Sequence, residues 1–380
     1  LLYQRRAGSS SRELVEELEE MNGAFRRARA QGDGRGGEDE RMLVLVTYDV
    51  ASMYPSMKHG WLVRAVDTVM AEREREGASE EERAAAGKLR EVVVKLLIFL
   101  LQHQIVSVPR EEEEGLDFYL QYEGIGIGQG SSGAVANIGL WEGERAVLRQ
   151  LEAEGYEVLM YRRLQDDGIL QALAASRKEA EALGERLATL LEEVDEEGKS
   201  IQIPRKDLKV VMVPWIEAPR VGEGGAAAAG AAGGGSREGK GEQVQGEGIE
   251  YLDVWLEWVR DRETGAPQVR TSMYRKPAAK DMYLPADSFH PQACKLGVVK
   301  GEAVRYVTRC SDEEGFRKAW ERFKAAMERR GYTGQELERA KGVEWKDRAR
   351  VREGMDAKAQ GRARTRESSR GGCYKACSMK

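Results

Sequence analysis

The chain has 380 residues, a formal net charge of −5, and charged residues at 33% of its positions, which is a profile typical of a soluble protein. This length can bury a large core and hold two domains. The acidic balance excludes a uniformly basic surface, although a local basic face can still attract a polyanion. No apolar stretch approaches the roughly 18 residues that span a membrane, and no secretory or other targeting signal is identified. We therefore expect an intracellular protein, nuclear or cytoplasmic, without a membrane partner.

The four cysteines, Cys294, Cys310, Cys373 and Cys377, are too few and too scattered for a disulfide framework, so a reducing compartment is expected. Cys373 and Cys377 are separated by three residues, but no histidine-rich segment follows them. A zinc site at this pair is therefore disfavoured.

The predicted elements begin with a charged helix over residues 11–30 and a glycine-rich break over 31–40. The apolar run RMLVLVTYDV follows and suits a strand buried on both faces, with Asp49 at its C-terminal end. Helices are predicted over 61–75 and 80–104. The second contains VVVKLLIFLLQ, which is apolar nearly all round and is therefore expected to be buried.

Strands and helices then alternate. The predicted order is a strand over 117–122, a glycine loop GIGIGQGSSG, a helix over 134–153, a strand over 156–164, a short strand over 168–173, a helix over 176–195 and a strand over 207–213. Residues 221–248 are low in complexity, cannot build a core, and are expected to form a disordered surface loop. The segment IEYLDVWLEWV resumes as a strand, and the chain beyond residue 286 is predicted to be mostly helical.

Composition divides the chain into four segments. These are a charged helix with a glycine-rich linker over 1–40, a sheet-containing region over 41–285, a helical region over 286–340 and a basic, disordered tail over 341–380. From Arg339 to Lys380 there are 13 lysines and arginines against 5 acidic residues. Such a tail is usually just solvated, but its charge also makes it a candidate arm for nucleic acid.

The element order from residue 42 to 213 predicts an α+β fold, with a split βαβ, ferredoxin-like sheet that carries its helices on one face. In such a sheet the strand ending at Asp49 lies beside the hairpin YRRLQDDGIL, which carries Asp166 and Asp167. An Asp pair before glycine also fits a plain hairpin turn. Three converging carboxylates, however, repel one another unless cations are bound, and oxygen ligands suit Mg²⁺. The pattern thus indicates either a turn or a two-metal nucleotidyl-transfer centre.

The glycine loop supports an alternative hypothesis. Gly128, Gly130 and Gly133 match the fingerprint G-x-G-x-x-G of NAD(P)-binding oxidoreductases, and Arg162 and Arg163 after the next strand would receive a 2′-phosphate. The strand before the loop, however, contains alternating polar residues, whereas a central parallel strand should be apolar throughout. The motif is also weak in a chain with 43 glycines.

In order along the chain, several motifs resemble those of the reverse transcriptases of Penelope-like retroelements. LVTYDVASMYPSM is similar to the first catalytic motif, GIGIGQGSSGAVANIGL to the glycine-rich second motif, RLQDDGIL to the Asp-Asp hairpin and IEYLDVWLEW to a later strand. TSMYRKPAAKDMYLPADSFHP is similar to the region after the palm and is the most distinctive stretch. The resemblance spans residues 42–340 apart from the low-complexity loop. It implies a polymerase palm over 41–285 and a thumb-like helical region over 286–340.

The resemblance implies an RNA-directed DNA polymerase that joins a dNTP to a primer 3′-hydroxyl with two Mg²⁺ ions, which Mn²⁺ can replace. The implied partners are an RNA template, a DNA primer or RNA–DNA hybrid, and dNTPs. Asp49 and Asp166 would bind both metals, and Asp167 would assist. The backbone carbonyl of Val50 would also reach a metal.

Further site residues follow from the same resemblance. Tyr54 would lie under the incoming sugar and exclude a 2′-hydroxyl, although it also fits a core tyrosine. Gly128 would let the backbone approach the template and nucleotide, and Gln129 would contact either of them. Arg275 and Lys276 would bind primer or template phosphates.

The sequence departs from the family pattern at several points. Leu164 stands where the family has Tyr, and Gly133 stands where Pro is expected. Only 48 residues precede Asp49, which is too few for the fingers that contact the triphosphate, and the first residue is Leu. We therefore expect a truncated product, and a catalytically weak or inactive nucleic-acid-binding remnant is the alternative function. His290 is expected to be a structural hydrogen-bonder rather than a catalyst.

Overall fold

The computed structural model describes residues 10–30, 41–110, 114–128, 130–192, 203–215, 248–277 and 282–358. The chain divides into two compact units. The first unit comprises Leu1–Ser10, Phe25–Tyr251 and Arg260–Pro267, and the second unit comprises Ser11–Ala24, Leu252–Val259 and Gln268–Lys380. Within the described residues, no helix combines the length and the hydropathy needed to cross a bilayer. The predicted domain boundaries at 40, 285 and 340 stay a prediction.

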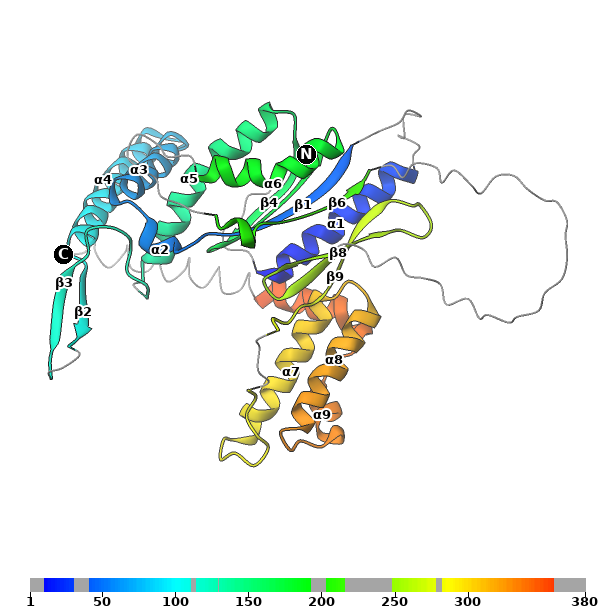
Figure 1. Cartoon of the computed structure of the whole chain (residues 1–380). Helices are drawn as coiled ribbons and strands as arrows, with labels where there is room; N and C mark the ends of the chain where they lie inside the picture. The colour runs from blue at the N-terminus through cyan, green and yellow to red at the C-terminus, as the bar shows by residue number, and fades with distance from the viewer. Residues whose placement is uncertain are drawn as a thin grey trace, which may run out of the picture. The chain divides into compact units, whose positions relative to one another are not determined.

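A four-stranded antiparallel sheet lies at the centre of the first unit (Figure 1). Its strands are β1 (Met42–Asp49), β4 (Glu157–Leu164), β5 (Asp167–Ala174) and β6 (Lys209–Pro214), in the order β4-β5-β1-β6. Helix α5 (Ser132–Ala153) precedes β4, and α6 (Arg177–Glu192) connects β5 with β6. This connectivity and strand order are those of the split βαβ sheet. The predicted α+β class and its topology are therefore confirmed.

Helices α5 and α6 cover the same face of this sheet, as predicted. Val44 and Val46 of β1 belong to one buried core with Leu148 of α5 and Leu187 of α6. Because side chains alternate along a strand, the odd-numbered residues of β1 point to the opposite face. Asp49 is the last of these, so its side chain belongs to the face without α5 and α6.

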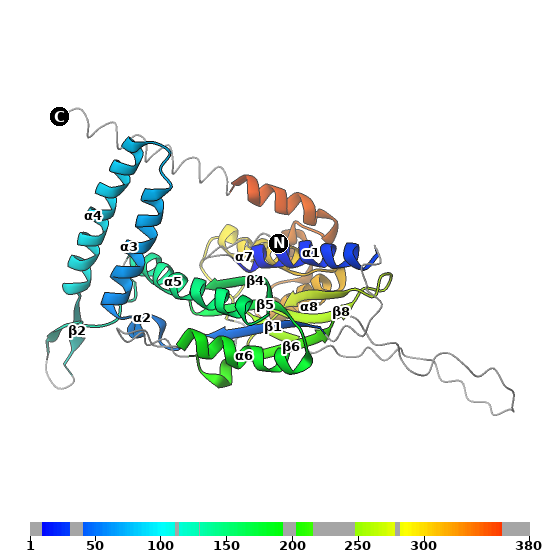
Figure 2. The same cartoon turned by 90° about the horizontal axis from the view of Figure 1, so that it is seen from above.

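Smaller elements complete the first unit. They are α2 (Met53–Ser56), α3 (His59–Arg75), α4 (Glu80–Gln102), β2 (Ile105–Pro109), β3 (Leu116–Leu120), η1 (Arg205–Asp207) and β7 (Gly248–Tyr251). Helices α3 and α4 form a helical hairpin, and β2 pairs with β3 beyond its open end (Figure 2). Ser79 caps α4 by accepting from the amide of Glu82, and Arg90 of α4 donates to Asp67 of α3 at 2.6 Å. No element was predicted over Ile105–Pro109, so β2 was missed.

The prediction that α4 is buried is wrong. Leu97 and Leu101 are buried on the side of α4 that faces α3. Val92, Leu96 and Phe99 are 61%, 53% and 55% exposed. An apolar composition shows that a helix is able to be buried, but it does not show how many neighbours the fold supplies.

The second unit is mostly helical, as predicted beyond residue 286. It contains most of α1 (Ser11–Ala30) and of the strands β8 (Val254–Arg260) and β9 (Pro267–Met273), together with α7 (Gln292–Arg309), α8 (Glu313–Glu328), α9 (Gly334–Lys341), η2 (Trp345–Asp347) and helical residues 348–358. Phe316, Trp320 and Phe323 of α8 pack with Val307 of α7 and Leu337 of α9 in its core. Three helices around one aromatic cluster thus form the body of this unit.

The segment IEYLDVWLEWV is not one strand, which corrects the prediction. Strand β7 ends at Tyr251, and β8 begins at Val254 after a turn. Leu252 in this turn has a φ of 56°, in the left-handed region, which interrupts an extended strand. Leu252 and Asp253 in the turn are themselves partly buried, so no exposed polar stretch marks the break between the two strands in the sequence.

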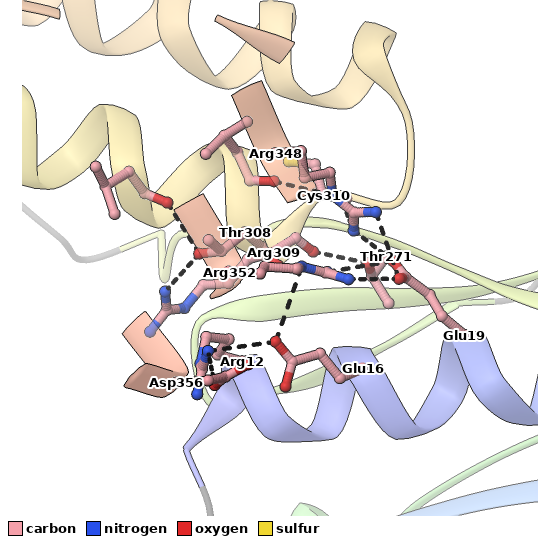
Figure 3. Close-up of polar contacts among 12 residues, drawn as sticks. Arg12, Glu16, Glu19, Thr271, Thr308, Arg309, Cys310, Arg348, Arg352 and Asp356 are labelled. Carbon is pink, nitrogen blue, oxygen red and sulfur yellow. Dashed lines mark hydrogen bonds and ion pairs between the residues drawn. The ribbon is translucent and has the colours of Figure 1, made fainter. Parts of the chain in front are cut away.

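Ion pairs join the two ends of the second unit (Figure 3). Glu19 of α1 accepts from Arg348 and, at 2.7 Å, from Arg352, although 329 and 333 positions separate these residues. Arg12 donates to Asp356 at 2.7 Å. Both Arg348 and Arg352 also donate to backbone carbonyls at the end of α7. The first part of α1 is therefore a structural part of the second unit rather than a separate N-terminal segment.

Asp253, in the turn before β8, anchors α7. Its carboxylate lies 2.7 Å from Nε of Arg305 and 3.0 Å from Nε of Arg309. Burial alone would raise the pKa of Asp253, but the hydroxyl of Ser11 and the two guanidinium groups outweigh it, so the pKa lies below its ordinary value. The Leu-Asp turn of the sequence motif thus serves a structural role.

Asp253→Asn keeps the side-chain size and removes the charge. We expect the free energy of unfolding at neutral pH to fall by about 2 kcal/mol, because Arg309 loses its ion pair and Arg305 keeps only the one with Glu302. The pKa of Asp253 is lowered on folding, so its contribution is present above about pH 4 and is lost as the pH falls through the folded pKa. Urea denaturation over a pH series measures this difference, which should vanish in acid.

Glu314→Gln is the matched control, because it breaks the exposed pair with Lys318 within one helix. Its urea midpoint should equal that of the wild type. An equal loss in both variants, or a difference for Asp253→Asn that persists in acid, would contradict the assigned role.

Candidate functional site

The β4–β5 turn brings the predicted carboxylates to the end of β1. Asp49 lies directly opposite Asp167 in the antiparallel register of β1 and β5. The amide of Val50 donates to the carbonyl of Asp166 at 3.0 Å, which continues the contact one residue beyond the strand. Directly opposed residues of antiparallel strands share a face of the sheet. Asp49 and Asp167 therefore belong together to the face opposite α5 and α6.

Asp49, Asp166 and Asp167 are all partly exposed. In the described part of the chain, no three His, Cys, Asp or Glu side chains are grouped so that they could hold a metal ion by themselves. A Mg²⁺ ion in phosphoryl transfer, however, is typically bound by one or two carboxylates together with substrate phosphates and water. The oxygens of Asp49 and Asp167 fit that smaller donor set. The division of roles between Asp166 and Asp167 stays a prediction, and the register places Asp167 opposite Asp49.

Two tyrosines support the strands behind the carboxylates. The hydroxyls of Tyr48 on β1 and Tyr161 on β4 lie 2.5 Å apart. A Cβ atom at Gly168 would lie 2.1 Å from the ring of Tyr48, so only glycine after the Asp pair lets this ring cross β5. Burial, and then the nearby carboxylate of Glu144, raises the pKa of both hydroxyls well above the ordinary value. Both tyrosines thus stay neutral and act as fixed packing and hydrogen-bonding groups.

A buried arginine holds the turn that carries the Asp pair. Arg163 on β4 is 1% exposed. Its guanidinium donates to the carboxylate of Glu144 and, at 2.9 Å, to Oδ1 of Asn137, both on α5. It also donates to the carbonyl of Gln165 at 2.6 Å, and Gln165 has a left-handed φ of 56°. Arg163 therefore positions the residue before Asp166 against the helix that follows the glycine loop.

Sequence reasoning missed this network, although a signal for it was present. Glu144 lies on the apolar face of α5, at helical spacing from Leu140, Val147 and Leu151. A carboxylate at a core position needs a buried cation, because an isolated buried charge is very costly. The matching cation was visible as well, because Arg162 and Arg163 lie within the largely apolar strand that became β4.

The sheet rules out the dinucleotide-binding alternative. That fold needs a parallel strand–helix–strand unit around the glycine loop. Here β3, before the loop, pairs with β2 in a separate two-stranded sheet, and β4, after α5, lies in an antiparallel sheet. Arg162 and Arg163, the proposed acceptors of a 2′-phosphate, are both buried.

The glycine loop is instead fastened to the segment that carries Tyr54. The amide of Ile125 donates to the carbonyl of Tyr54 at 3.0 Å, and the amide of Gly124 donates to the carbonyl of Met57 at 2.8 Å. A Cβ atom at Gly124 would lie 2.7 Å from the carbonyl of Pro55, so this close approach requires glycine. Gly124 was not singled out in the sequence, and its requirement comes from this packing alone.

The rest of the loop leads from Tyr54 into α5. Gly128 has a φ of 91°, and a Cβ atom there would meet no atom within 4 Å, so the space beside it is open. A Cβ atom at Gly133 would lie 3.9 Å from the hydroxyl of Tyr54. Tyr54 is partly buried and packs against the core of the first unit. Gln129 lies outside the described residues.

Arg275 and Lys276 belong to the second unit, whereas the carboxylates belong to the first. The two basic residues line a cavity of about 640 Å³. The rings of Trp255 and Tyr274 stack in its wall with centroids 6.0 Å apart, and the guanidinium of Arg275 lies 6.0 Å from the centroid of Tyr283. A cavity with both cations and aromatic faces can accept a phosphate backbone and its bases.

Other predicted features are structural or lie outside the described residues. His290 approaches the hydroxyl of Ser288 with its Nδ1 at 3.1 Å. Cys294 is exposed, and Cys310 is buried, which raises the pKa of its thiol to about 12. The features outside the described residues are the break at 31–40, most of the low-complexity loop, the tail beyond residue 358, Cys373 and Cys377.

Comparisons with known proteins give partial matches. The family model described as the animal helix-turn-helix domain matches residues 282–341, which include α7, α8 and α9. No curated protein matches the chain significantly.

Several solved structures of telomerase are similar in part. Telomerase from Candida albicans in complex with a TWJ fragment of telomeric RNA is 11% identical, with a TM-score of 0.47 over 91% of this chain and 50% of that chain. Apo telomerase from Candida tropicalis is 11% identical, with a TM-score of 0.44 over 85% of this chain and 46% of that chain. This chain thus spans half or less of their length. Because these TM-scores are below 0.5, we infer function from the residues of this chain.

Arg163→Met leaves the carboxylate of Glu144 buried without its cation. We expect the free energy of unfolding to fall by about 3–5 kcal/mol. Hydrogen exchange at residues 164–168 should also accelerate, because the carbonyl of Gln165 loses its donor. Arg163→Met with Glu144→Leu should recover most of the stability, because no buried charge remains, but it should not restore slow exchange in the turn.

The control is Arg186→Met, which breaks a more exposed ion pair with Glu154. This variant should leave exchange at 164–168 unchanged. If exchange in the turn is the same in Arg163→Met and in the wild type, then Arg163 stabilises the core without positioning the Asp pair.

Proposed function

We propose that the chain is the palm and thumb-like region of an RNA-directed DNA polymerase of the Penelope-like type. The observation that carries this proposal is the register that sets Asp49 opposite Asp167, with the amide of Val50 bonded to the carbonyl of Asp166. These residues lie at one end of a split βαβ sheet, on the face opposite its helices. Partly exposed carboxylates on adjacent strands suit divalent cations better than any uncharged partner.

The chemistry follows from the arrangement of these groups. Two divalent cations bound there would activate a primer 3′-hydroxyl and neutralise charge on the leaving pyrophosphate. The residues of the chain supply the positioning, which is the larger part of phosphoryl-transfer catalysis. Arg163 fixes the turn, and the glycine after the Asp pair lets Tyr48 pack beneath it.

Tyr54 is proposed to select the sugar. The glycine loop bonds to the carbonyl of Tyr54, and its own backbone is open at Gly128. A nucleotide between the carboxylates and the loop would meet the ring of Tyr54, which would clash with a 2′-hydroxyl. Gln129, as the neighbour of Gly128, is proposed to contact the template or the nucleotide.

The nucleic-acid partners are proposed to be an RNA template with a DNA primer, or their hybrid. Arg275 and Lys276 would contact phosphates, because they stand beside aromatic rings in the wall of the cavity in the second unit. A second candidate is a nucleic-acid-binding protein without turnover. Leu164 favours this second candidate, because it stands opposite Asp167 at a position where the resembled family has a tyrosine.

Metal binding tests the carboxylates directly. We expect the 380-residue chain to bind Mn²⁺, as measured by electron paramagnetic resonance. Asp49→Asn and Asp167→Asn should each weaken binding by about tenfold or more, since even outer-shell groups contribute this much. Asp117→Asn, which removes an exposed carboxylate on β3, is the control and should bind like the wild type.

Primer extension and binding of an RNA–DNA hybrid then separate the two candidates. Extension that needs Asp49 and Asp167 supports the polymerase. Hybrid binding that weakens as salt rises, with no extension even when an upstream segment is supplied, supports the protein without turnover. A chain that binds neither Mn²⁺ nor the hybrid contradicts both.

Tyr54→Val tests sugar selection in a preparation that extends primers. The ratio of dNTP to rNTP incorporation should fall, because the ring that meets the 2′-hydroxyl is gone. Tyr54→Phe keeps the ring and loses only the hydroxyl near Gly133, so it should keep the wild-type ratio. If the ratio is unchanged in Tyr54→Val, the side chain only packs against the core.

A further inference from the structure

Helix α4 presents an apolar stripe to solvent. The stripe consists of Leu89, Val92, Leu96 and Phe99, which are all exposed. Their spacing of three, four and three residues is that of the a and d positions of a heptad repeat. Exposed apolar patches that line up in this way mark interaction sites on soluble proteins.

The stripe is separate from the side of α4 that packs within the first unit. Leu97 and Leu101 are buried in the main core. Consecutive residues of a helix are turned by about 100°, so Leu96 and Leu97 point in different directions. Helix α4 forms a hairpin with α3 (Figures 1 and 2), and the stripe stays exposed.

Two lysines border one edge of the stripe. Lys88 and Lys95 each stand one residue before an a position, which makes both of them g residues of the heptad. Lys95 is exposed and pairs at 2.5 Å with Glu91, which lies further from the stripe. The e positions on the other edge are Val93 and Leu100. The stripe thus has one basic edge and one apolar edge.

We propose that this stripe binds an amphipathic α-helix of another protein, one with an apolar face and acidic residues opposite Lys88 and Lys95. The apolar face supplies burial, and the acidic residues supply charge complementarity that selects the partner. The stripe from Leu89 to Phe99 is about 15 Å long at the rise of an α-helix. A partner helix of three to four turns covers it.

A second copy of the chain fits this surface poorly. In an antiparallel pair the g positions of the two helices face each other, so Lys88 and Lys95 would lie beside their own copies. In a parallel pair they would face the e positions, where Val93 and Leu100 offer no counter-charge. An acidic partner helix supplies counter-charges to Lys88 and Lys95, whereas a second copy supplies none in either orientation.

A peptide with leucine at a and d and glutamate at e and g tests the proposal. Fluorescence anisotropy measures its binding to the 380-residue chain, at peptide concentrations where sedimentation shows it to be monomeric. A second peptide has lysine at e and g. We expect the acidic peptide to bind about tenfold tighter or more, because like charges across an interface are strongly disfavoured.

Variants of the chain locate the site. Leu96→Glu with Phe99→Glu should abolish binding of the acidic peptide, and Lys88→Glu with Lys95→Glu should reverse the preference between the peptides. Phe118→Glu makes the same chemical change at an exposed residue of β3 and should bind like the wild type. Circular dichroism should show unchanged folding, since all five positions are exposed.

Four results would overturn the proposal. The first is equal binding of the two peptides, and the second is loss of binding in Phe118→Glu but not in Leu96→Glu with Phe99→Glu. The third is a dimer in sedimentation velocity that Leu96→Glu with Phe99→Glu dissociates. The fourth is binding to anionic lipid vesicles that the same double variant abolishes. The third result would assign the stripe to a second copy, and the fourth would assign it to a membrane surface.

Discussion

The antiparallel pairing of β1 with β5 is the constraint on which the candidate site depends. Because side chains alternate with a period of two, one register puts Asp49 and Asp167 on the same face, and a slip by one residue would turn one of them into the helical core. The even-numbered residues of β1 lie in the core under α5 and α6, so the odd-numbered Asp49 belongs to the other face. The geometry of the carboxylates is thus a consequence of core packing.

Partly or fully buried ion pairs link turns and helices whose positions apolar packing alone does not fix. Arg163 and Glu144 link the β4–β5 turn to α5 in the first unit. Asp253 links the turn before β8 to α7, and Glu19 links α1 to the C-terminal helical residues in the second unit. Each pair gives up solvation, so it persists only where several hydrogen bonds converge. Glu19 and Asp253 each meet this requirement by pairing with two arginines.

Helix α4 shows the opposite case, an apolar element that the fold leaves open. Its composition is that of a core helix, yet α3 is the helix that packs along it in the described residues, and one full stripe stays exposed. The burial of a strand in the central sheet is fixed by neighbours on both sides. A helix at the edge of a unit has neighbours on one side only, so apolar residues on its other side stay exposed and can contact another molecule.

The sequence by itself determined the α+β class, the split βαβ order and the position of the Asp pair in a hairpin, because alternation, helical periodicity and turn residues are local signals. It did not determine the strand register, the burial of α4, the break at Leu252 or the membership of α1 in the second unit. Those features depend on which surfaces meet, and residues such as Glu19 and Arg352 are 333 positions apart. Local pattern decides what an element is, whereas only tertiary contacts decide what it touches.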